Sequence, residues 1–402
     1  MNILLVSSYL PYPLTSGGHI RLYNLLKELS GKHMVTLICE KRDYQGDAEI
    51  NELKKFCKKV IAVPRNKQWT VKNILKTGLS FSPFLITGHT SFEMKKEIKR
   101  EINENQFDLI HAETSYVMQN IPQTDIPIVL VEHNVEYLIY KRFADNAPLL
   151  LKPLLYIDVL KLKYWEEKIW KRATRLVAVS QSDKEIMDKL KQDTSIVSNG
   201  VDVKKFKMQS SKFKTDGKEK RILFIGDFKW VQNRDAINWI IKEIWPRLRA
   251  EFIPSMTDRG IKLWVVGRSI PDKIKKLTND KSIVFDEQAP KETEAIYQRS
   301  DIVLTPIRVG GGTSYKILEG MASGVPVITT PLGNAMNAKE DYEIVIAKTP
   351  KDFVEKIKRL LEDEKFYNGI SVNARKLVEE KFNWKKISND LNSVYESIIP
   401  YA

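Results

Sequence analysis

Two ionisable side chains follow a run of glycines in the second half of the sequence. An apolar segment, 302–304, leads into three consecutive glycines, which are Gly310, Gly311 and Gly312. Because glycine has no Cβ, this loop can bring main-chain N–H groups close to an anion, and a helix expected from Thr313 adds its unpaired N–H groups. Lys316 and Glu319 are three residues apart and therefore share one face of that helix. The pattern predicts a phosphate or diphosphate site, with Lys316 as the cation and Glu319 as an acceptor for sugar or ribose hydroxyls.

A structural interpretation of the same residues stays open, because glycine loops are weak motifs by themselves. The three glycines could form a plain turn, with Lys316 and Glu319 as a solvated surface pair. Arg308 lies just ahead of the glycines and could reach a phosphate, or it could be an ordinary exposed arginine.

A histidine lies at the expected tip of a strand in the first half of the sequence. The apolar run 128–131 predicts a buried strand, and Glu132, His133 and Asn134 follow it directly. A neutral imidazole can accept one hydrogen bond and donate another, which suits holding a sugar hydroxyl near a reacting carbon. We expect a functional role for His133, with a purely structural histidine as the alternative.

A second glycine turn follows the first expected strand, 2–6. It contains Gly17 and Gly18, and a helix with an apolar face is expected over 19–29. This turn lies at the carboxyl end of a strand, where open α/β sheets bind ligands. Gly17, Gly18 and Arg21 are therefore candidates for ligand contacts, although a helix entry with a surface arginine would give the same pattern.

Short apolar runs alternate with helical patterns along the whole chain. This alternation predicts α/β folding with doubly wound parallel sheets, and 402 residues are enough for two domains. In the second half we expect a helix over 236–249, capped by Asn233 and Asp235. A long amphipathic helix is expected within 147–172, with Leu160, Tyr164 and Ile169 facing inward and a basic opposite face.

The segment 66–92 mixes lysines with aromatic and aliphatic side chains and has no clear period. It could lie on a bilayer surface, line an acceptor pocket, or form a packed helix and loop.

Composition limits the partners. The net charge of +14 and the pI near 9.4 favour anionic ligands or an anionic membrane surface. No zinc-finger, RNP-type or helix-turn-helix pattern is present, so we expect no nucleic acid partner. Two cysteines, no secretory signal and no apolar run of membrane-spanning length predict a cytoplasmic protein, peripheral at the inner face of the cell membrane.

Three motifs together resemble glycosyltransferase family four, the glycosyl transferases group 1. They are KILEGMASGVPVITT over 316–330, EHNVE over 132–136, and NGVD over 199–202 with a downstream Phe206. The resemblance implies the GT-B fold, with two Rossmann-like domains facing across a cleft. It implies an acceptor domain over 1–203, a linker over 204–220, a nucleotide-sugar domain over 221–382, and a final helix over 383–402 that crosses back to the first domain.

The resemblance also implies roles for individual residues. The implied catalytic residues are His133, Lys316 and Glu319, and the implied acceptor contacts are Arg21 and Asn134. The implied donor contacts are Gly17, Gly18, Lys229, Arg234, Arg308, Gly310, Gly311, Gly312 and Thr313.

The sequence departs from the family pattern at three places. Gly311 stands where many members carry a first glutamate, and Asp227 and Gln232 stand where relatives carry basic residues that contact the donor phosphates. Lys229 and Arg234 are the nearest basic substitutes.

We therefore expect transfer of a sugar from a nucleotide-diphosphate sugar to an acceptor hydroxyl, with retention of configuration, as a hexosyltransferase does. No Asp-x-Asp pair stands at a strand end, which favours a metal-independent site, and no cofactor is expected beside the nucleotide-diphosphate sugar as co-substrate. The acceptor would be a glycan or lipid-linked sugar of the cell surface. A GT-B sugar-nucleotide epimerase or phosphorylase, or a catalytically inactive nucleotide-binding partner subunit, remains as an alternative.

Overall fold

The computed structural model describes residues 1–145, 147–190, 193–208, 219–252, 260–289, 292–309 and 313–399. The predicted glycine loop, Gly310, Gly311 and Gly312, lies outside these residues, as does most of the predicted linker. The chain divides into two compact units: Met1–Ser198 with Ile387–Ala402, and Asn199–Lys386. The division lies a few residues before the predicted linker, and the end of the chain belongs to the first unit.

The first unit is built on a seven-stranded sheet in which every neighbouring pair is parallel, with the order β3-β2-β1-β4-β5-β6-β7. Its strands are β1 (Asn2–Ser7), β2 (Met34–Lys41), β3 (Lys59–Pro64), β4 (Leu109–Glu113), β5 (Ile128–Glu132), β6 (Arg175–Ala178) and β7 (Ser195–Ile196). The central strands β1, β4 and β5 are buried almost throughout, and β1 and β5 are mostly apolar, as expected of a parallel sheet with both faces covered.

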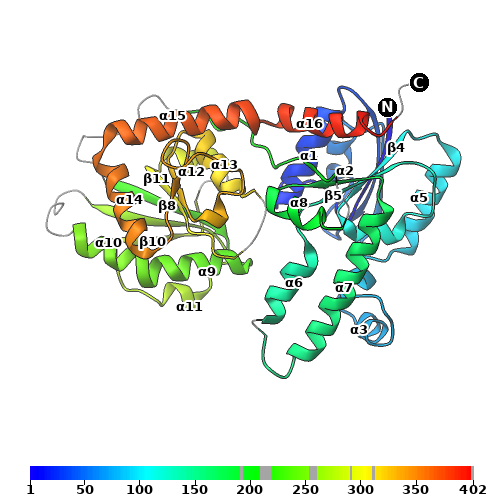
Figure 1. Cartoon of the computed structure of the whole chain (residues 1–402), viewed down its shortest axis with the longest axis horizontal. Helices are drawn as coiled ribbons and strands as arrows, with labels where there is room; N and C mark the ends of the chain where they lie inside the picture. Colours follow the sequence, from blue (N-terminus) through cyan, green and yellow to red (C-terminus); the bar gives the residue numbers. More distant parts are fainter. Residues whose placement is uncertain are drawn as a thin grey trace. The chain divides into compact units, whose positions relative to one another are not determined.

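Helices connect these strands and complete the unit (Figure 1). They are α1 (Gly17–Leu29), α2 (Asp47–Leu53), α3 (Val71–Gly78), α4 (Phe84–Gly88), α5 (Phe92–Glu104), η1 (Ser115–Asn120), α6 (Glu136–Asp145), α7 (Lys152–Arg172), α8 (Gln181–Met187) and, at the end of the chain, α16 (Trp384–Glu396). The segment 66–92 thus contributes two short helices, and α6 is a helix that the sequence analysis did not predict.

The second unit repeats the architecture with a six-stranded parallel sheet, in the order β10-β9-β8-β11-β12-β13. Its strands are β8 (Lys220–Asp227), β9 (Ile261–Arg268), β10 (Ile283–Asp286), β11 (Ile302–Thr305), β12 (Val327–Thr329) and β13 (Val345–Ile346). Its helices are α9 (Val231–Trp239), η2 (Ile240–Ile244), α10 (Trp245–Phe252), α11 (Asp272–Lys275), α12 (Thr293–Gln298), α13 (Tyr315–Ala322), η3 (Pro331–Gly333), α14 (Pro350–Glu362) and α15 (Glu364–Lys381).

The structure corrects two local predictions. Asn233 and Asp235 do not cap the helix, because α9 already begins at Val231 and both residues lie inside it. Leu160 and Tyr164 do not face inward: they are 66% and 67% exposed, whereas Ile169 is buried. Amphipathic spacing predicts an apolar stripe but cannot say whether anything covers it.

No helix among the described residues is both long and apolar enough to cross a membrane.

Candidate functional site

In the second unit, the side chain of Asn233 joins the β8–α9 turn to the start of α13. Its Oδ1 accepts a hydrogen bond from Lys316 Nζ at 2.6 Å, and its Nδ2 donates to the main-chain oxygen of Asp227 at 2.7 Å. Gly226 makes room for this arrangement, since a Cβ there would lie 2.7 Å from the Asn233 side chain. The Lys316 ammonium also lies 5.0 Å from the centre of the Phe224 ring. Lys316 is therefore held at the carboxyl end of β8.

Glu319 lies one turn further along α13, on the same face as Lys316, as the spacing predicted. Its Oε2 accepts a hydrogen bond from the Tyr297 hydroxyl at 2.8 Å. Burial raises the pKa of Glu319 to about 7, although Tyr297, Lys205 and Lys316 act against this. Burial lowers the pKa of Lys316 to about 8, although Glu319 opposes the shift. Both groups therefore change charge close to neutral pH, so a bound anion or hydroxyl can set their protonation.

Most of the other donor residues predicted in this unit contact the protein itself. Arg308 donates to both carboxylate oxygens of Asp235, at 2.8 and 3.1 Å, and its guanidinium lies 4.4 Å from the centre of the Trp239 ring. Arg234 donates to the main-chain oxygens of Phe228 and Lys229, both at 3.0 Å. Arg308 and Arg234 thus stabilise α9 and the turn before it.

Lys229 and Thr313 complete the predicted set in the second unit. Lys229 is exposed, and its main-chain N–H donates to Oδ1 of Asp227 at 2.9 Å. Thr313 is buried, and its carbonyl accepts from Nδ2 of Asn199 at 2.9 Å. Asn199, the first residue of the NGVD motif, therefore contacts the main chain two residues before α13 begins at Tyr315.

In the first unit, a buried carboxylate organises the polar groups around His133. Glu113, at the end of β4, accepts from His133 Nε2 at 2.6 Å and from His111 Nε2 at 2.7 Å. The other ring nitrogen of His111 lies 2.5 Å from the Tyr395 hydroxyl of α16. The guanidinium of Arg21 is 4.0 Å from the Glu113 carboxylate. A hydrogen-bonded chain therefore runs from the last helix to His133.

The groups that contact Glu113 keep its carboxylate ionised. Complete burial alone would raise the pKa of Glu113, but His133 and His111 hold it well below its usual value. Because Nε2 of His133 is engaged by Glu113, Nδ1 is the ring nitrogen left to meet a ligand. The side chain of His133 is 20% exposed, whereas Glu113 is fully buried, so of the two only the imidazole can reach solvent or substrate.

The structure places Gly18 beside His133. A Cβ at Gly18 would lie 3.6 Å from Cε1 of His133 and 3.1 Å from the Tyr9 hydroxyl, which donates to the Gly18 carbonyl. Gly17 is the first residue of α1, and Ser16 caps that helix. The turn after β1 and the tip of β5 are therefore neighbours in the first unit.

Arg21 and Asn134 lie close to His133 but make protein contacts. Arg21 is 1% exposed and donates to the main-chain oxygens of Val197 and Ser198 at 2.9 and 2.8 Å. Asn134 lies near Glu136 at the start of α6 and acts against the rise that burial causes in the pKa of Glu136. In this structure Arg21 positions the end of the sheet and the Glu113 carboxylate.

Sequence reasoning missed Glu113, Asn233, Tyr297 and Tyr395. Glu113 carried one usable signal, because it is an acidic residue directly after a buried strand at the ligand-binding edge of a parallel sheet. Asn233, Tyr297 and Tyr395 carried no such signal, since the side chains that they contact are distant in sequence.

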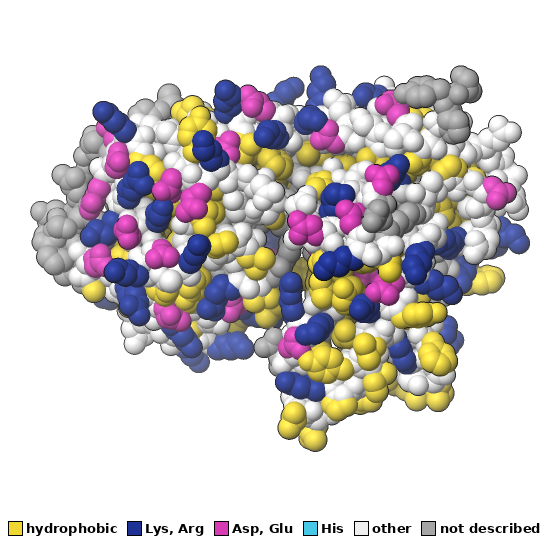
Figure 2. Space-filling model, in the orientation of Figure 1, with side chains coloured by type: hydrophobic (Ala, Val, Ile, Leu, Met, Phe, Trp, Pro, Cys, Tyr) yellow, Lys and Arg dark blue, Asp and Glu magenta, His cyan; other side chains and the backbone are white. Residues whose placement is uncertain are grey.

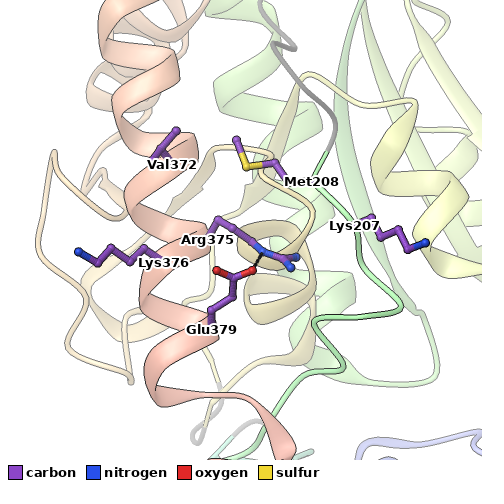
Figure 3. A pocket seen from close by; sticks show the side chains of 6 residues that line it. All are labelled: Lys207, Met208, Val372, Arg375, Lys376 and Glu379. Carbon is purple, nitrogen blue, oxygen red and sulfur yellow. Dashed lines mark hydrogen bonds and ion pairs between the residues drawn. The ribbon is translucent and has the colours of Figure 1, made fainter.

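A hollow of about 550 Å³ elsewhere in the second unit contains none of these residues. Figure 3 shows its lining, in which Arg375 points toward the chain at Met208 and pairs with Glu379 at 2.6 Å. Arg375 also donates to the main-chain oxygens of Val203, Phe206 and Ala322. Its guanidinium is thus used to hold the chain around residue 206 against α15.

Comparison with known proteins identifies the family. A model described as glycosyltransferase family 4 matches residues 15–205, and a model described as glycosyl transferases group 1 matches residues 219–363. A protein from the cps region of Klebsiella pneumoniae is 23% identical over 97% of this chain and 98% of its own length. The capsular polysaccharide biosynthesis glycosyltransferase CapM of Staphylococcus aureus is 26% identical over 56% of this chain and 62% of its own length.

Solved structures share the fold over nearly the whole chain. WaaG, a glycosyltransferase involved in lipopolysaccharide biosynthesis, has a TM-score of 0.66 at 14% identity, with complete coverage of both chains. The Anabaena protein HepE, solved with UDP and glucose, has a TM-score of 0.63 at 14% identity over 99% of this chain and 100% of its own. The predicted GT-B fold is confirmed. The two glycosyltransferase models together match most of the sequence, and this chain belongs to the glycosyltransferases that they describe.

Proposed function

We propose that this glycosyltransferase moves a hexosyl group from a nucleoside-diphosphate sugar to an acceptor hydroxyl, with retention of configuration and without a metal ion. The observation that carries the proposal is the placement of Lys316 and Glu319 on one face of α13, with Lys316 held by Asn233. HepE, which has the same fold, was solved with UDP and glucose and with UDP-glucose. The same ligand class is proposed here.

In this proposal the second unit stabilises the leaving diphosphate. The Lys316 ammonium meets charge that develops on the departing phosphate oxygens, and such donors act most strongly where the protein has already positioned them. Asn233 is the positioning residue for that ammonium. Glu319 accepts from a sugar or ribose hydroxyl through the oxygen that Tyr297 does not occupy.

The first unit presents His133 to the sugar hydroxyls. Its Nδ1 accepts a hydrogen bond from a hydroxyl while Nε2 donates to Glu113. The fixed carboxylate therefore selects the tautomer and stabilises a transient positive charge on the ring.

We propose a glycan or lipid-linked acceptor in cell-surface polysaccharide synthesis, with the enzyme cytoplasmic and peripheral at the membrane. Support comes from the names of CapM, which is assigned to capsular polysaccharide biosynthesis, and WaaG, which is assigned to lipopolysaccharide biosynthesis. The net charge of +14 is consistent with an anionic surface.

Thermal-shift measurement with UDP, GDP, ADP, CMP and their sugars tests the donor site. A ligand at 100 times its Kd stabilises the folded protein by about 2.7 kcal/mol, which raises the midpoint measurably. One nucleoside diphosphate should raise it, and Lys316→Ala and Glu319→Ala should reduce the shift. Lys242→Ala, an exposed lysine in η2, is the control and should leave it unchanged. No shift with any nucleotide would contradict the proposal.

Product analysis tests the reaction. With an acceptor present, transfer releases free nucleoside diphosphate, and the anomeric configuration of the product, read by NMR, should match that of the donor. Added EDTA should not change the rate. Nucleotide binding without release would favour the inactive partner subunit, an alternative motivated by Gly311, Asp227 and Gln232.

A further inference from the structure

The short helix α3 turns its apolar side chains toward solvent. It has no buried residue. Val71, Ile74 and Leu75, spaced to share one helical face, are all more than half exposed, and Trp69 before the helix is also exposed. Leu79 and Phe81, just after it, are 89% and 93% exposed. A surface helix of a soluble protein normally turns such a face inward, so this face has no partner within the described chain.

A second exposed apolar surface runs along the hairpin formed by α6 and α7, which projects from the sheet of the first unit (Figure 1). Its tip carries Leu149, Leu150 and Leu151, of which Leu150 is 91% exposed. A stripe then continues along α7 at intervals of three or four residues, through the exposed side chains of Leu154, Ile157, Leu160 and Tyr164. Figure 2 shows hydrophobic side chains gathered over this projecting part of the molecule.

Specific hydrogen bonds join the two surfaces and fix them to the unit. Lys161 of α7 donates to the main-chain oxygens of Thr77 and Ser80, at 2.8 and 2.7 Å, at the end of α3. Asp158 of α7 accepts from the main-chain N–H of Phe84 at 2.8 Å. The base of the hairpin is held by Glu166, whose oxygens accept from two N–H groups at the start of α6, at 2.8 and 3.0 Å. These hydrogen bonds therefore hold the exposed apolar residues in a defined arrangement.

The charge around these surfaces is strongly positive. Segments 66–81 and 139–164 contain eight basic residues and two acidic ones. The basic residues are Lys67, Lys72, Lys76, Lys141, Arg142, Lys152, Lys161 and Lys163. The two acids are Asp145, which pairs with Lys141 and Tyr156, and Asp158, which is bound to main chain. Apolar residues bordered by lysines match a bilayer with anionic headgroups, where the apolar groups enter the interface and the ammonium groups meet phosphates.

We infer that the apolar face of α3 and the tip and stripe of the α6–α7 hairpin together form a docking surface for an anionic lipid bilayer. This inference rests on the proposed action at a membrane and names the residues that make the contact. The hairpin tip enters the headgroup region, and Lys72 and Lys76 of α3 and Lys152 of α7 bind phosphates beside it. A second copy of the chain could cover the same face, but a pair of such surfaces would bring like charges together.

Vesicle flotation tests the surface with the full-length protein. The vesicles are phosphatidylcholine alone, or phosphatidylcholine with 30 mol% phosphatidylglycerol. We expect partition into the anionic vesicles for the wild type and at least a tenfold loss for Leu149→Ser with Leu150→Ser, which removes apolar area without changing charge. The matched control is Val372→Ser, an exposed valine on α15 of the second unit, which should partition as the wild type does.

The lysines are tested separately. The combined change Lys67→Ser, Lys72→Ser and Lys76→Ser should reduce partition into anionic vesicles several-fold and leave weak partition into neutral vesicles unchanged. Circular dichroism and the nucleotide-induced thermal shift of each variant, measured without lipid, show that the variant is folded and that its donor site is intact.

Equal partition of wild type and the Leu149/Leu150 variant would overturn the inference. A different result would also overturn it: the wild type binds no vesicle and sediments as a dimer, and the Leu149/Leu150 variant sediments as a monomer. The surface would then join two copies of the chain. If the wild type binds anionic vesicles but no nucleotide raises its thermal midpoint, the proposed function is refuted and the docking surface is supported.

Discussion

Glu113 of the first unit is buried and Glu319 of the second is partly buried, both beside a basic group, yet their pKa values shift in opposite directions. Glu113 has two imidazoles at hydrogen-bond distance and a guanidinium at 4.0 Å, and its pKa is well below the ordinary value. Glu319 has one neutral donor, Tyr297, and its pKa is raised to about 7.

The difference shows that partners rather than burial decide the charge of a carboxylate. Burial favours the neutral acid at both sites, and only at Glu113 do the surrounding groups outweigh it. Glu113 therefore stays an ionised hydrogen-bond acceptor, which orients His133. Glu319 can gain or lose its proton near neutral pH, so its charge can respond to a bound ligand.

The largest effect is expected for Glu113→Gln. The change removes the negative charge beside Arg21 and weakens the hydrogen bonds from His111 and His133, so the free energy of unfolding should fall by about 3 kcal/mol. Turnover should fall by roughly 100-fold because His133 is no longer oriented. Urea unfolding and a steady-state assay measure the two effects, and nucleotide affinity, set in the second unit, should not change. Unaltered turnover would show that His133 does not need this carboxylate.

The pH dependence of the same variant sharpens the comparison. A carboxyl with a lowered pKa stabilises the folded state above the unfolded value of 4.5, and this contribution is lost as the pH falls from there toward the folded pKa. The wild type should therefore lose more stability on acidification below 4.5 than Glu113→Gln does.

The next effect is expected at Lys316. Lys316→Ala removes a charge-assisted hydrogen bond to phosphate and should weaken nucleoside-diphosphate binding by about 1.5–3 kcal/mol. In the wild type the affinity should also fall as the pH rises through about 8, where Lys316 loses its proton. Lys316→Arg should show no such step, because a guanidinium stays charged. Calorimetric titration across this range measures the affinity, and an identical step in Lys316→Arg would assign it to another group.

Glu319→Gln should change the pH dependence of stability in the direction opposite to Glu113→Gln. A carboxyl with a raised pKa stabilises the folded state below 4.5, and this contribution is lost as the pH rises through about 7. Between these values the wild type should therefore lose about 3 kcal/mol relative to the variant. Urea midpoints at several pH values measure it, and parallel curves for the two proteins would mean that Glu319 is ionised in the folded state.

The smallest effect is expected for Tyr395→Phe. Loss of the hydrogen bond to His111 should cost about 1 kcal/mol of stability, and nucleotide binding should be unchanged. Thermal unfolding with and without nucleotide measures both. A loss as large as that of Glu113→Gln would mean that the ionisation of Glu113 depends on the whole chain of hydrogen bonds.

Local spacing predicted the parts of the fold that depend only on neighbouring residues. The strand before His133 follows from a continuous apolar run, and the common face of Lys316 and Glu319 follows from the helical period of 3.6 residues. The helix within 147–172 was also expected, but the burial of Leu160 and Tyr164 was not correctly predicted. An apolar stripe is a property of the helix, whereas its burial depends on which other element packs there.

The sequence by itself determined the two α/β halves, the family, and the candidate residues His133, Lys316 and Glu319, because short sequence motifs identify them. Only the tertiary structure decided that Asn233 holds Lys316, that Glu113 and Tyr395 stand behind His133, and that α3 and α7 expose their apolar faces. The physical reason is that hydrogen bonds and burial depend on distances in space. Tyr395 lies 284 residues from His111 in sequence, and no local pattern could place them 2.5 Å apart.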